Sequence, residues 1–367
     1  MASVQKRPDG RWRARYRDPA DKEHARHFAR RADAERWLDE VRSDLLRGTY
    51  VAPGAGRVLF ADFARTWLEA QPHRAGTARL YERTLRLHVF PRIGDRPLAA
   101  VRRSDIQALV TASSRQLAPK TVENHFRLIK AVFNAAVEDQ LIAVSPCRKI
   151  ARATVAPSRV MPLSIEQVSR LVEAAPARLQ ALVVTAVGTG LRQGEALGLR
   201  AQDVDFLRRE VHVRHQLVSV PGVAAHLGPP KTVSSLRTVP APSFVLQALA
   251  EHMKRFPAGP FGMIFTNTRG QFVNRQSLHR SLAAALRTAG LPAGTTFHQL
   301  RHTYASLLIE GGESVTVVAS RMGHANATET LHTYSHLWPS SDDKTRHVLE
   351  RAFAQAAHDT TEERSSG

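Results

Sequence analysis

Near its C-terminus the chain reads His298-Gln299-Leu300-Arg301-His302, then Met322-Gly323-His324 and Tyr334-Ser335-His336. The three-residue step from His298 to Arg301 places an imidazole and a guanidinium on one face of a helix. Upstream, Gly190-Leu191-Arg192-Gln193-Gly194-Glu195 supplies a second arginine, with a carboxylate one helical turn later. Guanidinium forks suit the non-bridging oxygens of a phosphate, imidazoles transfer protons near neutral pH, and a phenol can act as a nucleophile. These side chains, in this order, predict chemistry on a phosphodiester.

The composition indicates a nucleic-acid partner. The 367 residues carry a formal net charge of +19, and 43% of them are hydrophobic, so two or three packed domains are expected. Such a charge favours a polyanion, with nucleic acid first and an anionic membrane surface second. The single cysteine, Cys147, excludes an internal disulfide. Because no signal peptide precedes the first domain and the longest strongly apolar stretch is 181–187, we expect a cytoplasmic protein without a membrane span.

Residues 1–50 are predicted to form a small sheet backed by a helix. Within 11–17, arginine alternates with Trp12, Ala14 and Tyr16, and this period of two is typical of a strand with one basic and one packed face. A third short strand is expected at 27–29 and a helix over 32–46. The basic face carries the candidate DNA-binding residues Arg11, Arg13, Arg15 and Arg17. The alternative interpretation is a solvated edge strand whose charges block aggregation.

A linker over 48–57 leads to a stretch, 57–147, that is predicted to be helical throughout. Helices are expected over 60–70, over 77–88, after a cap at Ser104, and over 121–139. The apolar face of the second helix is predicted to carry Leu80, Tyr81, Thr84 and Leu87, and that of the last Val122, Phe126, Ile129, Phe133 and Ala136. Residues 91–98 are expected to form a rigid connection, and 147–160 a basic interdomain linker. The candidate DNA contacts of this domain are Arg79, Arg83, Lys120 and Arg127, each of which is equally well explained as a solvated side chain.

The third domain, over 160–357, is predicted to mix helices with short strands. Ser164-Ile165-Glu166-Gln167 is a capping box, and a helix is expected from it to about residue 188. Residues 204–213 and 216–240 alternate like antiparallel strands, with turns near 208–209 and 221–222. Helical patterns resume at Phe244, and the polar tail 358–367 is expected to be disordered. The expected fold class is therefore mainly α with small β-sheets (α+β).

The order of these motifs resembles the tyrosine recombinases, the phage integrase family, over most of the chain. The resemblance implies an arm-type DNA-binding domain, a helical core-binding domain and a catalytic domain. It implies the catalytic residues Arg192, Lys231, His298, Arg301, His324 and Tyr334, supported by Glu195 and His302. Lys231 is preferred to Lys254, which falls in an amphipathic helix. Tyr304, the competitor of Tyr334, is expected to pack inside its own helix.

The resemblance also implies a mechanism. Tyr334 attacks the scissile phosphate, forms a 3′-phosphotyrosyl link and releases a 5′-hydroxyl. The two arginines bind the non-bridging oxygens, Lys231 protonates the leaving oxygen, His298 acts as a base toward Tyr334, and His324 hydrogen-bonds the phosphate. No cofactor or metal is implied, and a zinc site built from the histidines would lack an HExxH motif and an acidic ligand.

The implied partner is double-stranded DNA with core-type and arm-type attachment sites, bound by a homotetramer. A host bending protein and an excisionase are further candidate partners of a phage or mobile-element integrase. Two other functions stay open at this point. One is a type IB topoisomerase, which would rejoin the same strand, and the other is a non-catalytic DNA-binding regulator.

Overall fold

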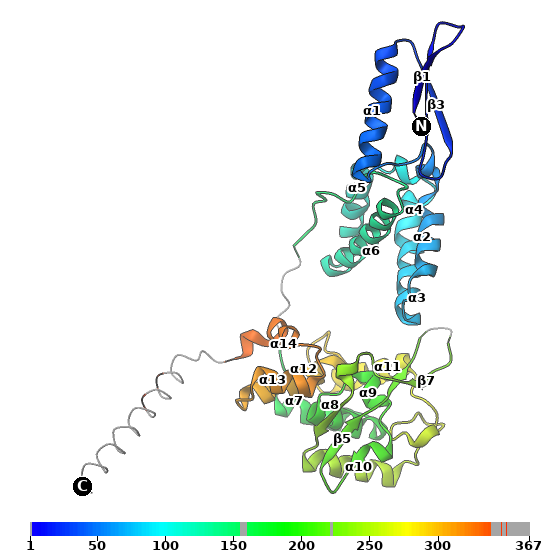
Figure 1. Ribbon diagram of the computed structural model, residues 1–367. Helices are drawn as coiled ribbons and strands as arrows, with labels where there is room; N and C mark the ends of the chain where they lie inside the picture. The colour runs from blue at the N-terminus through cyan, green and yellow to red at the C-terminus, as the bar shows by residue number, and fades with distance from the viewer. Residues whose placement is uncertain (1, 155–159, 221–222, 339–345, 347–349, 351–367) are drawn as a thin grey trace, which may run out of the picture. The chain divides into compact units, whose positions relative to one another are not determined.

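The computed structural model describes residues 2–154, 160–220, 223–338, 346 and 350 (Figure 1). The chain divides into two compact units, Met1–Pro157 and Ser158–Gly367. The turn expected at 221–222, most of the helical pattern expected beyond 338 and the tail at 358–367 lie outside the described residues. The expected fold class, mainly α with small β-sheets, is confirmed.

The first unit begins with a three-stranded antiparallel sheet. Strands β1 (Ser3–Lys6), β2 (Trp12–Arg17) and β3 (Glu23–Phe28) lie in the order β1-β2-β3, followed by helix α1 (Arg31–Arg47). Ala14 and Tyr16 of β2 are buried in one cluster with Ala34 and Leu38 of α1, so the predicted period of two is correct. Because β2 is the central strand, the edge-strand alternative is wrong.

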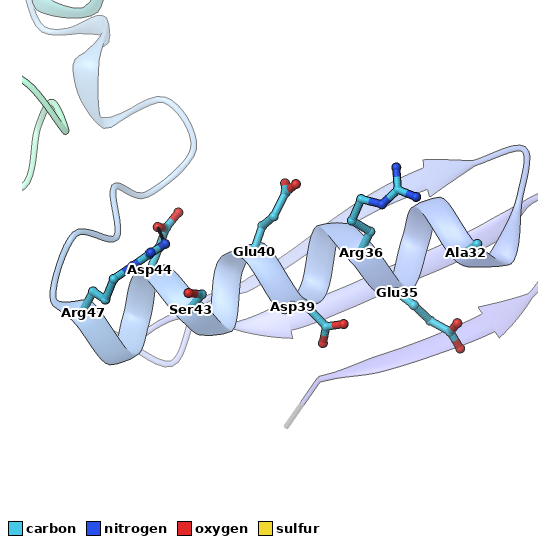
Figure 2. A pocket seen from close by; sticks show the side chains of 8 residues that line it. All are labelled: Ala32, Glu35, Arg36, Asp39, Glu40, Ser43, Asp44 and Arg47. Carbon is cyan, nitrogen blue, oxygen red and sulfur yellow. Dashed lines mark hydrogen bonds and ion pairs between the residues drawn. The ribbon is translucent and has the colours of Figure 1, made fainter.

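The outer face of α1 carries charges of both signs. Figure 2 shows Glu35, Asp39 and Glu40 projecting from the helix, with Arg36 and Arg47 among them. Glu35 and Asp39 are paired with arginines of the same helix, at 2.8 and 3.3 Å. In this part of the chain, arginine therefore predominates on the exposed face of the sheet and not on the outer face of α1.

The expected linker over 48–57 is divided between the two parts that it joins. Tyr50 is buried in the N-terminal cluster, and its hydroxyl lies 2.9 Å from that of Tyr16. Gly56, within the 3-10 turn η1 (Ala55–Arg57), packs so closely on Ala99 that a Cβ there would lie 2.6 Å from the Ala99 Cβ. The boundary between the sheet part and the helical part therefore falls between residues 50 and 55.

Seven short segments build the helical part: α2 (Phe60–Ala70), α3 (Ala75–Thr84), the π-helical η2 (Leu85–Val89), α4 (Phe90–Ile93), η3 (Leu98–Ala100), α5 (Arg103–Ser114) and α6 (Pro119–Glu138). The predicted last helix is confirmed, and all five of its expected apolar residues are buried. The predicted start of the rigid connection at residue 91 is wrong, because Pro91 lies inside α4. Proline lacks an N–H and is tolerated in the first turn of an α-helix, and Pro91 occupies that turn of α4, directly after the π-helical η2.

Two further details of this part differ from the prediction. Leu80 is 61% and Leu87 45% exposed, whereas Leu85 and Val89 are buried. The π turn over Leu85–Val89 shifts the face that the 3.6-residue period predicts for Leu87, whereas Leu80 lies before that turn, in α3. The third helix begins at Arg103, so Ser104 is not its cap. Instead the Asp105 carboxylate accepts a hydrogen bond from the Arg102 N–H at 2.7 Å, which satisfies the helix end.

The helical part also extends further than predicted. Cys147 and Ile150 are buried in its core, and burial raises the pKa of the Cys147 thiol to about 11. The Arg103 side chain donates to the Lys149 carbonyl at 2.7 Å, and Gln107 exchanges two hydrogen bonds with Ala151. The first five residues of the expected 147–160 linker are therefore packed against the helices.

The second unit opens with α7 (Ile165–Ala174), α8 (Ala177–Thr189) and α9 (Gln193–Leu197). The predicted capping box at Ser164 is confirmed by reciprocal hydrogen bonds with Gln167 of 2.9 and 3.2 Å. The single helix expected up to residue 188 is interrupted at Ala175-Pro176, since proline cannot continue the hydrogen-bond ladder. The expected strands are present as a sheet of order β4-β5-β8 and a β6–β7 hairpin. Their bounds are β4 (Val204–Asp205), β5 (Glu210–Val213), β6 (Gln216–Val218), β7 (His226–Gly228) and β8 (Arg237–Pro240).

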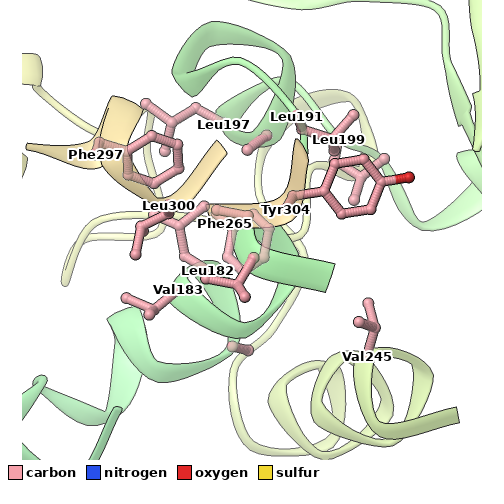
Figure 3. Packing of buried hydrophobic residues seen from close by; sticks show 14 of the residues in the cluster. Leu182, Val183, Leu191, Leu197, Leu199, Val245, Phe265, Phe297, Leu300 and Tyr304 are labelled. Carbon is pink, nitrogen blue, oxygen red and sulfur yellow. The ribbon is translucent and has the colours of Figure 1, made fainter. Parts of the chain in front are cut away.

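Further helices in the described part of this unit pack around one hydrophobic core. They are α10 (Ser243–Arg255), α11 (Arg275–Thr288), α12 (Phe297–Glu310), α13 (Val315–Met322) and α14 (Ala327–Tyr334), followed by the turn η7 (Ser335–Leu337). Figure 3 shows Leu191, Leu300 and Tyr304 among the packed side chains. Leu191 and Leu300 directly precede Arg192 and Arg301 in the sequence, so their burial fixes the backbone from which both arginine side chains extend. Among the described residues, no helix is long and apolar enough to cross a membrane.

Candidate active site

Arg192 stands at the N-terminal end of α9 and joins three segments of the chain. Its Nη1 donates to Glu195 Oε1 at 2.9 Å and to Ser235 Oγ at 3.0 Å, and its Nη2 donates to the Gly323 carbonyl at 2.8 Å. The Arg192 backbone N–H also donates to the other Glu195 oxygen, at 2.9 Å. Glu195 therefore holds both the backbone and the guanidinium of Arg192.

Arg301, on α12, is almost fully enclosed. Its residue is only 1% exposed, and its guanidinium donates to the carbonyls of Gly190, at 2.7 Å, and Met322. Burial, reinforced by the positive charge of Arg192, lowers the pKa of Arg301 to about 9. The side chain is thus still charged at neutral pH.

Gly190 makes the Arg301 contact possible. Its φ of +63° belongs to the left-handed region that favours glycine. A Cβ at Gly190 would also lie 2.2 Å from a ring carbon of Tyr304. Tyr304 is buried against this backbone, as expected for a packed residue of α12.

Tyr334, the last residue of α14, is 1% exposed. Its phenolic oxygen lies 2.6 Å from Nδ1 of His302 on α12. Burial raises the pKa of Tyr334 to about 12, although Arg301 acts in the opposite direction. Burial, with the neighbouring His298 and Arg301, lowers the pKa of His302 to about 4. A neutral phenol and a neutral imidazole therefore meet at this contact.

The contact to Tyr334 comes from His302 and not from His298, the residue expected to act on it. His298 is solvent-exposed, and its ring packs edge-on to that of His302 with centroids 4.4 Å apart. A helix turns by about 100° per residue, so His302 is one turn beyond His298 and faces α14. The two histidines form a row that runs from the surface to Tyr334.

His324 follows Gly323, which ends α13 in the left-handed conformation. Its Nδ1 lies 2.7 Å from Oγ1 of the buried Thr330 on α14. Burial and the charges of Arg301 and Arg192 lower the pKa of His324 to about 4. His324 thus connects the backbone segment that binds both arginines with the helix that carries Tyr334.

Lys231 lies in the loop between β7 and the 3-10 turn η5 (Val233–Ser235), and it is exposed. Within the described part of the chain, the structure groups the other five expected residues and leaves Lys231 outside their contacts. A short path nevertheless leads to them, because Thr232 Oγ1 lies 2.8 Å from Ser235 Oγ, the acceptor for Arg192. The loop that carries Lys231 is therefore anchored to the Arg192 site.

Sequence reasoning missed Arg237. Its Nη2 donates to Glu195 Oε2 at 2.9 Å, and its Nε donates to the Arg321 carbonyl at 2.7 Å. One feature of the sequence could have indicated it: Arg237 begins a short strand, β8, whose other residues include the buried Val239. The described residues contain no group of three or more His, Cys, Asp or Glu side chains placed to hold a metal ion.

The candidate DNA-binding residues are exposed or half-exposed. Arg13 donates to Glu23 at 3.2 Å, Arg15 to Ser3 at 2.9 Å and Arg17 to Asp21 at 2.9 Å, so the three candidates on β2 have neighbours that fix their direction, whereas Arg11 directly precedes the strand. In the helical part the exposed candidates are Arg79 and Arg83 on α3 and Lys120 and Arg127 on α6.

Comparison with known proteins gives the family. The sequence model of the phage integrase family matches residues 162–340, that of the phage integrase N-terminal domain matches 2–47, and that of the phage integrase central domain matches 60–153. The chain belongs to the phage integrase family. The integrase of Mycobacterium phage D29 is 27% identical over 88% of this chain and 89% of its own length. Tyrosine recombinase XerD of Mycobacterium leprae is 31% identical over 64% of this chain and 73% of its own length.

Solved structures agree with this membership. The Tn1549 transposon integrase in complex with a circular intermediate DNA has a TM-score of 0.71 and 26% identity, and the match covers 80% of this chain and 99% of that chain. A lambda integrase tetramer bound to a Holliday junction has a TM-score of 0.57 over 89% of this chain and 96% of that chain, and at 19% identity it shows the fold alone. This member of the phage integrase family is a site-specific tyrosine recombinase, and the family implies that it breaks and rejoins DNA strands.

Proposed function

We propose that the enzyme integrates or excises phage or mobile-element DNA through a covalent 3′-phosphotyrosyl link to Tyr334. The observation that carries this proposal is the contact of Tyr334 with His302, beside two buried or half-buried arginines. Attack by the phenol oxygen forms the Tyr334–phosphorus bond, breaks the bond to the 5′ oxygen and releases a 5′-hydroxyl. The link keeps the energy of the phosphodiester, so that a 5′-hydroxyl of a partner strand can reverse the step without ATP.

Arg192 and Arg301 are the proposed phosphate ligands. Their positions favour binding of the two non-bridging oxygens, because both guanidiniums are held by the same backbone segment, 322–323. Preorganised donors of this kind stabilise charge that develops in a transition state. With Lys231 they supply the positive charge that metal ions provide in many nucleases. His324, tied to the same segment, is the proposed further donor to the phosphate.

The histidine row is the proposed path for the Tyr334 proton. At neutral pH His302 is neutral and can accept, but its pKa of about 4 lies far below the Tyr334 value of about 12. Proton transfer is therefore strongly unfavourable in the DNA-free protein. As the phenol oxygen bonds to the bound phosphate its proton becomes strongly acidic, so His302 can accept that proton during the attack. His298, at the exposed end of the row, is proposed to assist as the base that passes the proton onward.

Cleavage also requires the site to open. Tyr334 and Arg301 are each 1% exposed, so a DNA phosphate cannot reach either while α14 stays in place. We infer that α14 shifts when DNA binds. Lys231, on its exposed loop, then protonates the leaving 5′ oxygen, a role that suits an ammonium and not a guanidinium.

DNA contact is proposed for two surfaces of the first unit. The arginine face of the N-terminal sheet would bind arm-type sites through Arg11, Arg13, Arg15 and Arg17, and the helical part would bind core-type sites. Because exchange between two duplexes needs four cleavages, we propose a homotetramer on DNA, the assembly named for lambda integrase. A host bending protein and an excisionase would act on the same DNA in the bacterial cytoplasm.

Recombination between two different DNA molecules tests this function. DNA that flanks the coding sequence supplies candidate attachment sites, and one partner carries a label. We expect joint molecules to form in excess EDTA and without ATP. A type IB topoisomerase would relax supercoils without joint molecules, and a non-catalytic regulator would leave the DNA intact, so either result would contradict the proposal.

A further inference from the structure

Arg237 is an almost buried arginine next to the candidate active site, and the mechanism above gives it no role. It begins strand β8, and its side chain is 6% exposed. Its guanidinium donates to Glu195 Oε2, to the Arg321 carbonyl and to the Ser235 carbonyl at 2.9, 2.7 and 3.0 Å. These acceptors lie on or next to the segments that hold Arg192, and an arginine is rarely buried unless it is paired in this way.

The key contact is the carboxylate that Arg237 shares with Arg192. One Glu195 oxygen accepts from the Arg192 guanidinium, and the other accepts from Arg237. Glu195 is 3% exposed, so water screens these charges little. Burial would raise the pKa of Glu195, but the charge of Arg237 and its hydrogen bond prevail and hold that pKa below its usual range. The group is therefore two cations around one anion.

The charge balance of this group bears on the phosphate. With Arg192 and Glu195 alone, the carboxylate would cancel the charge of the guanidinium that must bind the phosphate. With Arg237 present, the three side chains keep one net positive charge, and Arg192 is the member with the greater exposure, at 29% of its side chain. Glu195 can then hold Arg192 in place without neutralising the site.

We propose that Arg237 is a positioning residue of this enzyme: its guanidinium offsets the charge of Glu195, so that Arg192 keeps its positive charge for the scissile phosphate. The inference rests on the proposed function, since it assigns Arg192 to that phosphate. The other contacts of Arg237 attach the same guanidinium to residues 321 and 235. Arg237 thus contacts the carboxylate that holds Arg192, the segment that follows Lys231 and the segment that precedes His324.

The structure also contains a matched control. Arg200, Asp203 and Arg214 form a similar group of two cations and one buried carboxylate, in which Arg200 donates to both Asp203 oxygens and the more exposed Arg214 lies 3.6 Å from one of them. Arg214→Gln removes the same charge from the whole protein as Arg237→Gln. It should leave the cleavage rate within about twofold of the wild type, as surface charge changes outside a site usually do.

The test is a measurement of single-turnover cleavage rates on attachment-site DNA. Removing a direct donor to a transition state costs roughly 10²–10³-fold, and because Arg237 acts through Arg192 we expect Arg237→Gln to lose roughly 10- to 100-fold. Arg237→Lys, which keeps the charge, should recover most of that loss. Adding Glu195→Gln to Arg237→Gln should also raise the rate, because the uncompensated carboxylate is removed.

A second substrate separates charge from shape. With a neutral methylphosphonate at the scissile position, the phosphate carries less negative charge, and the penalty of Arg237→Gln should shrink to a few-fold, the scale of a weak electrostatic effect. A purely structural role predicts equal losses on both substrates and a double variant no faster than Arg237→Gln, and that result would overturn the inference. Thermal unfolding of each variant shows whether the fold is kept. Absence of any wild-type cleavage would instead contradict the proposed function itself, and this inference with it.

Discussion

The phenolic oxygen of Tyr334 lies 2.6 Å from Nδ1 of His302 across the interface between α14 and α12. Both groups are neutral near pH 7, because burial raises the pKa of the phenol and lowers that of the imidazole. In the DNA-free enzyme Tyr334, the candidate nucleophile, is therefore protonated. It contacts His302, which can accept its proton once a phosphate is bound.

The depressed histidine pKa values predict a loss of stability in mild acid. The folded-state pKa of His302, about 4, lies below its ordinary value of 6.5, so folding favours the neutral ring. This stabilisation is complete above about pH 6.5 and is lost as the pH falls toward 4. Allowing for partial exposure, His302 should account for a decrease on the order of 1 kcal/mol in the free energy of unfolding between pH 7 and pH 5.

Urea unfolding at both pH values measures this effect. His302→Gln should reduce the difference between pH 7 and pH 5, while His336→Gln, at an exposed position outside the site, should not. If the free energy of unfolding depends on pH identically in wild type and His302→Gln, folding does not favour the neutral form of His302.

Gly323→Ala should disrupt the site more than its backbone strain alone explains. A Cβ there would lie 2.9 Å from Arg237 Nη1 and 3.0 Å from the Ser234 carbonyl oxygen, at a φ of +63°. Gly312 also has a positive φ but open space around it, so Gly312→Ala is the matched control for strain, which costs about 1 kcal/mol. We expect Gly323→Ala to lower the thermal midpoint further and to slow cleavage by at least tenfold, the scale of a displaced catalytic group. Equal effects of the two changes would argue against close packing of this segment on Arg237.

Lys231→Ala should slow cleavage by roughly 10²–10⁴-fold, the usual scale for losing acid catalysis. A substrate with sulfur at the bridging 5′ position needs little protonation of its leaving group. It should restore most of the rate to Lys231→Ala but not to Arg192→Ala, whose defect is in charge stabilisation. Rescue of Lys254→Ala instead, or of neither lysine variant, would move the general acid to another residue.

A protein that starts at residue 53 should keep core-site cleavage and lose integration that depends on arm-type sites. This start removes the sheet and α1 but retains η1 and Gly56, which pack on the helical part. Binding of arm-type DNA by the full chain should weaken steeply with salt, because contacts between arginine and phosphate release counterions. Integration by the shortened protein at the full rate would show that the N-terminal sheet is not needed for integration.

Local patterns in the sequence were sufficient for much of the fold. The apolar spacing from Val122 to Ala136 gave α6, the Ser164 capping box gave the start of α7, and the alternation at Trp12–Arg17 gave β2 with the correct buried face. Each of these depends on residues within a few positions of one another. The π turn before Pro91 was not foreseen, because hydrophobic periodicity assumes an unbroken α-helix.

The candidate site was foreseen in its composition but not in its contacts. The spacing of His298 and Arg301 placed them on one helix, yet it could not show that His302, one turn further, faces Tyr334, since that depends on how α12 packs against α14. For the same reason Arg237 was missed. Its partners, Glu195 and the Arg321 carbonyl, are 42 and 84 positions away, and only the folded chain brings them together.

The most direct test of the account is to locate the covalent bond to DNA. Labelled attachment-site DNA with a nick near the scissile phosphate is incubated with the enzyme, and products are separated under denaturing conditions. Wild type and Tyr304→Phe should form a protein–DNA adduct, whose digestion leaves a phosphorylated Tyr334, and Tyr334→Phe should bind the same DNA without forming it. An adduct that persists in Tyr334→Phe would contradict the assignment of the nucleophile and the mechanism built on it.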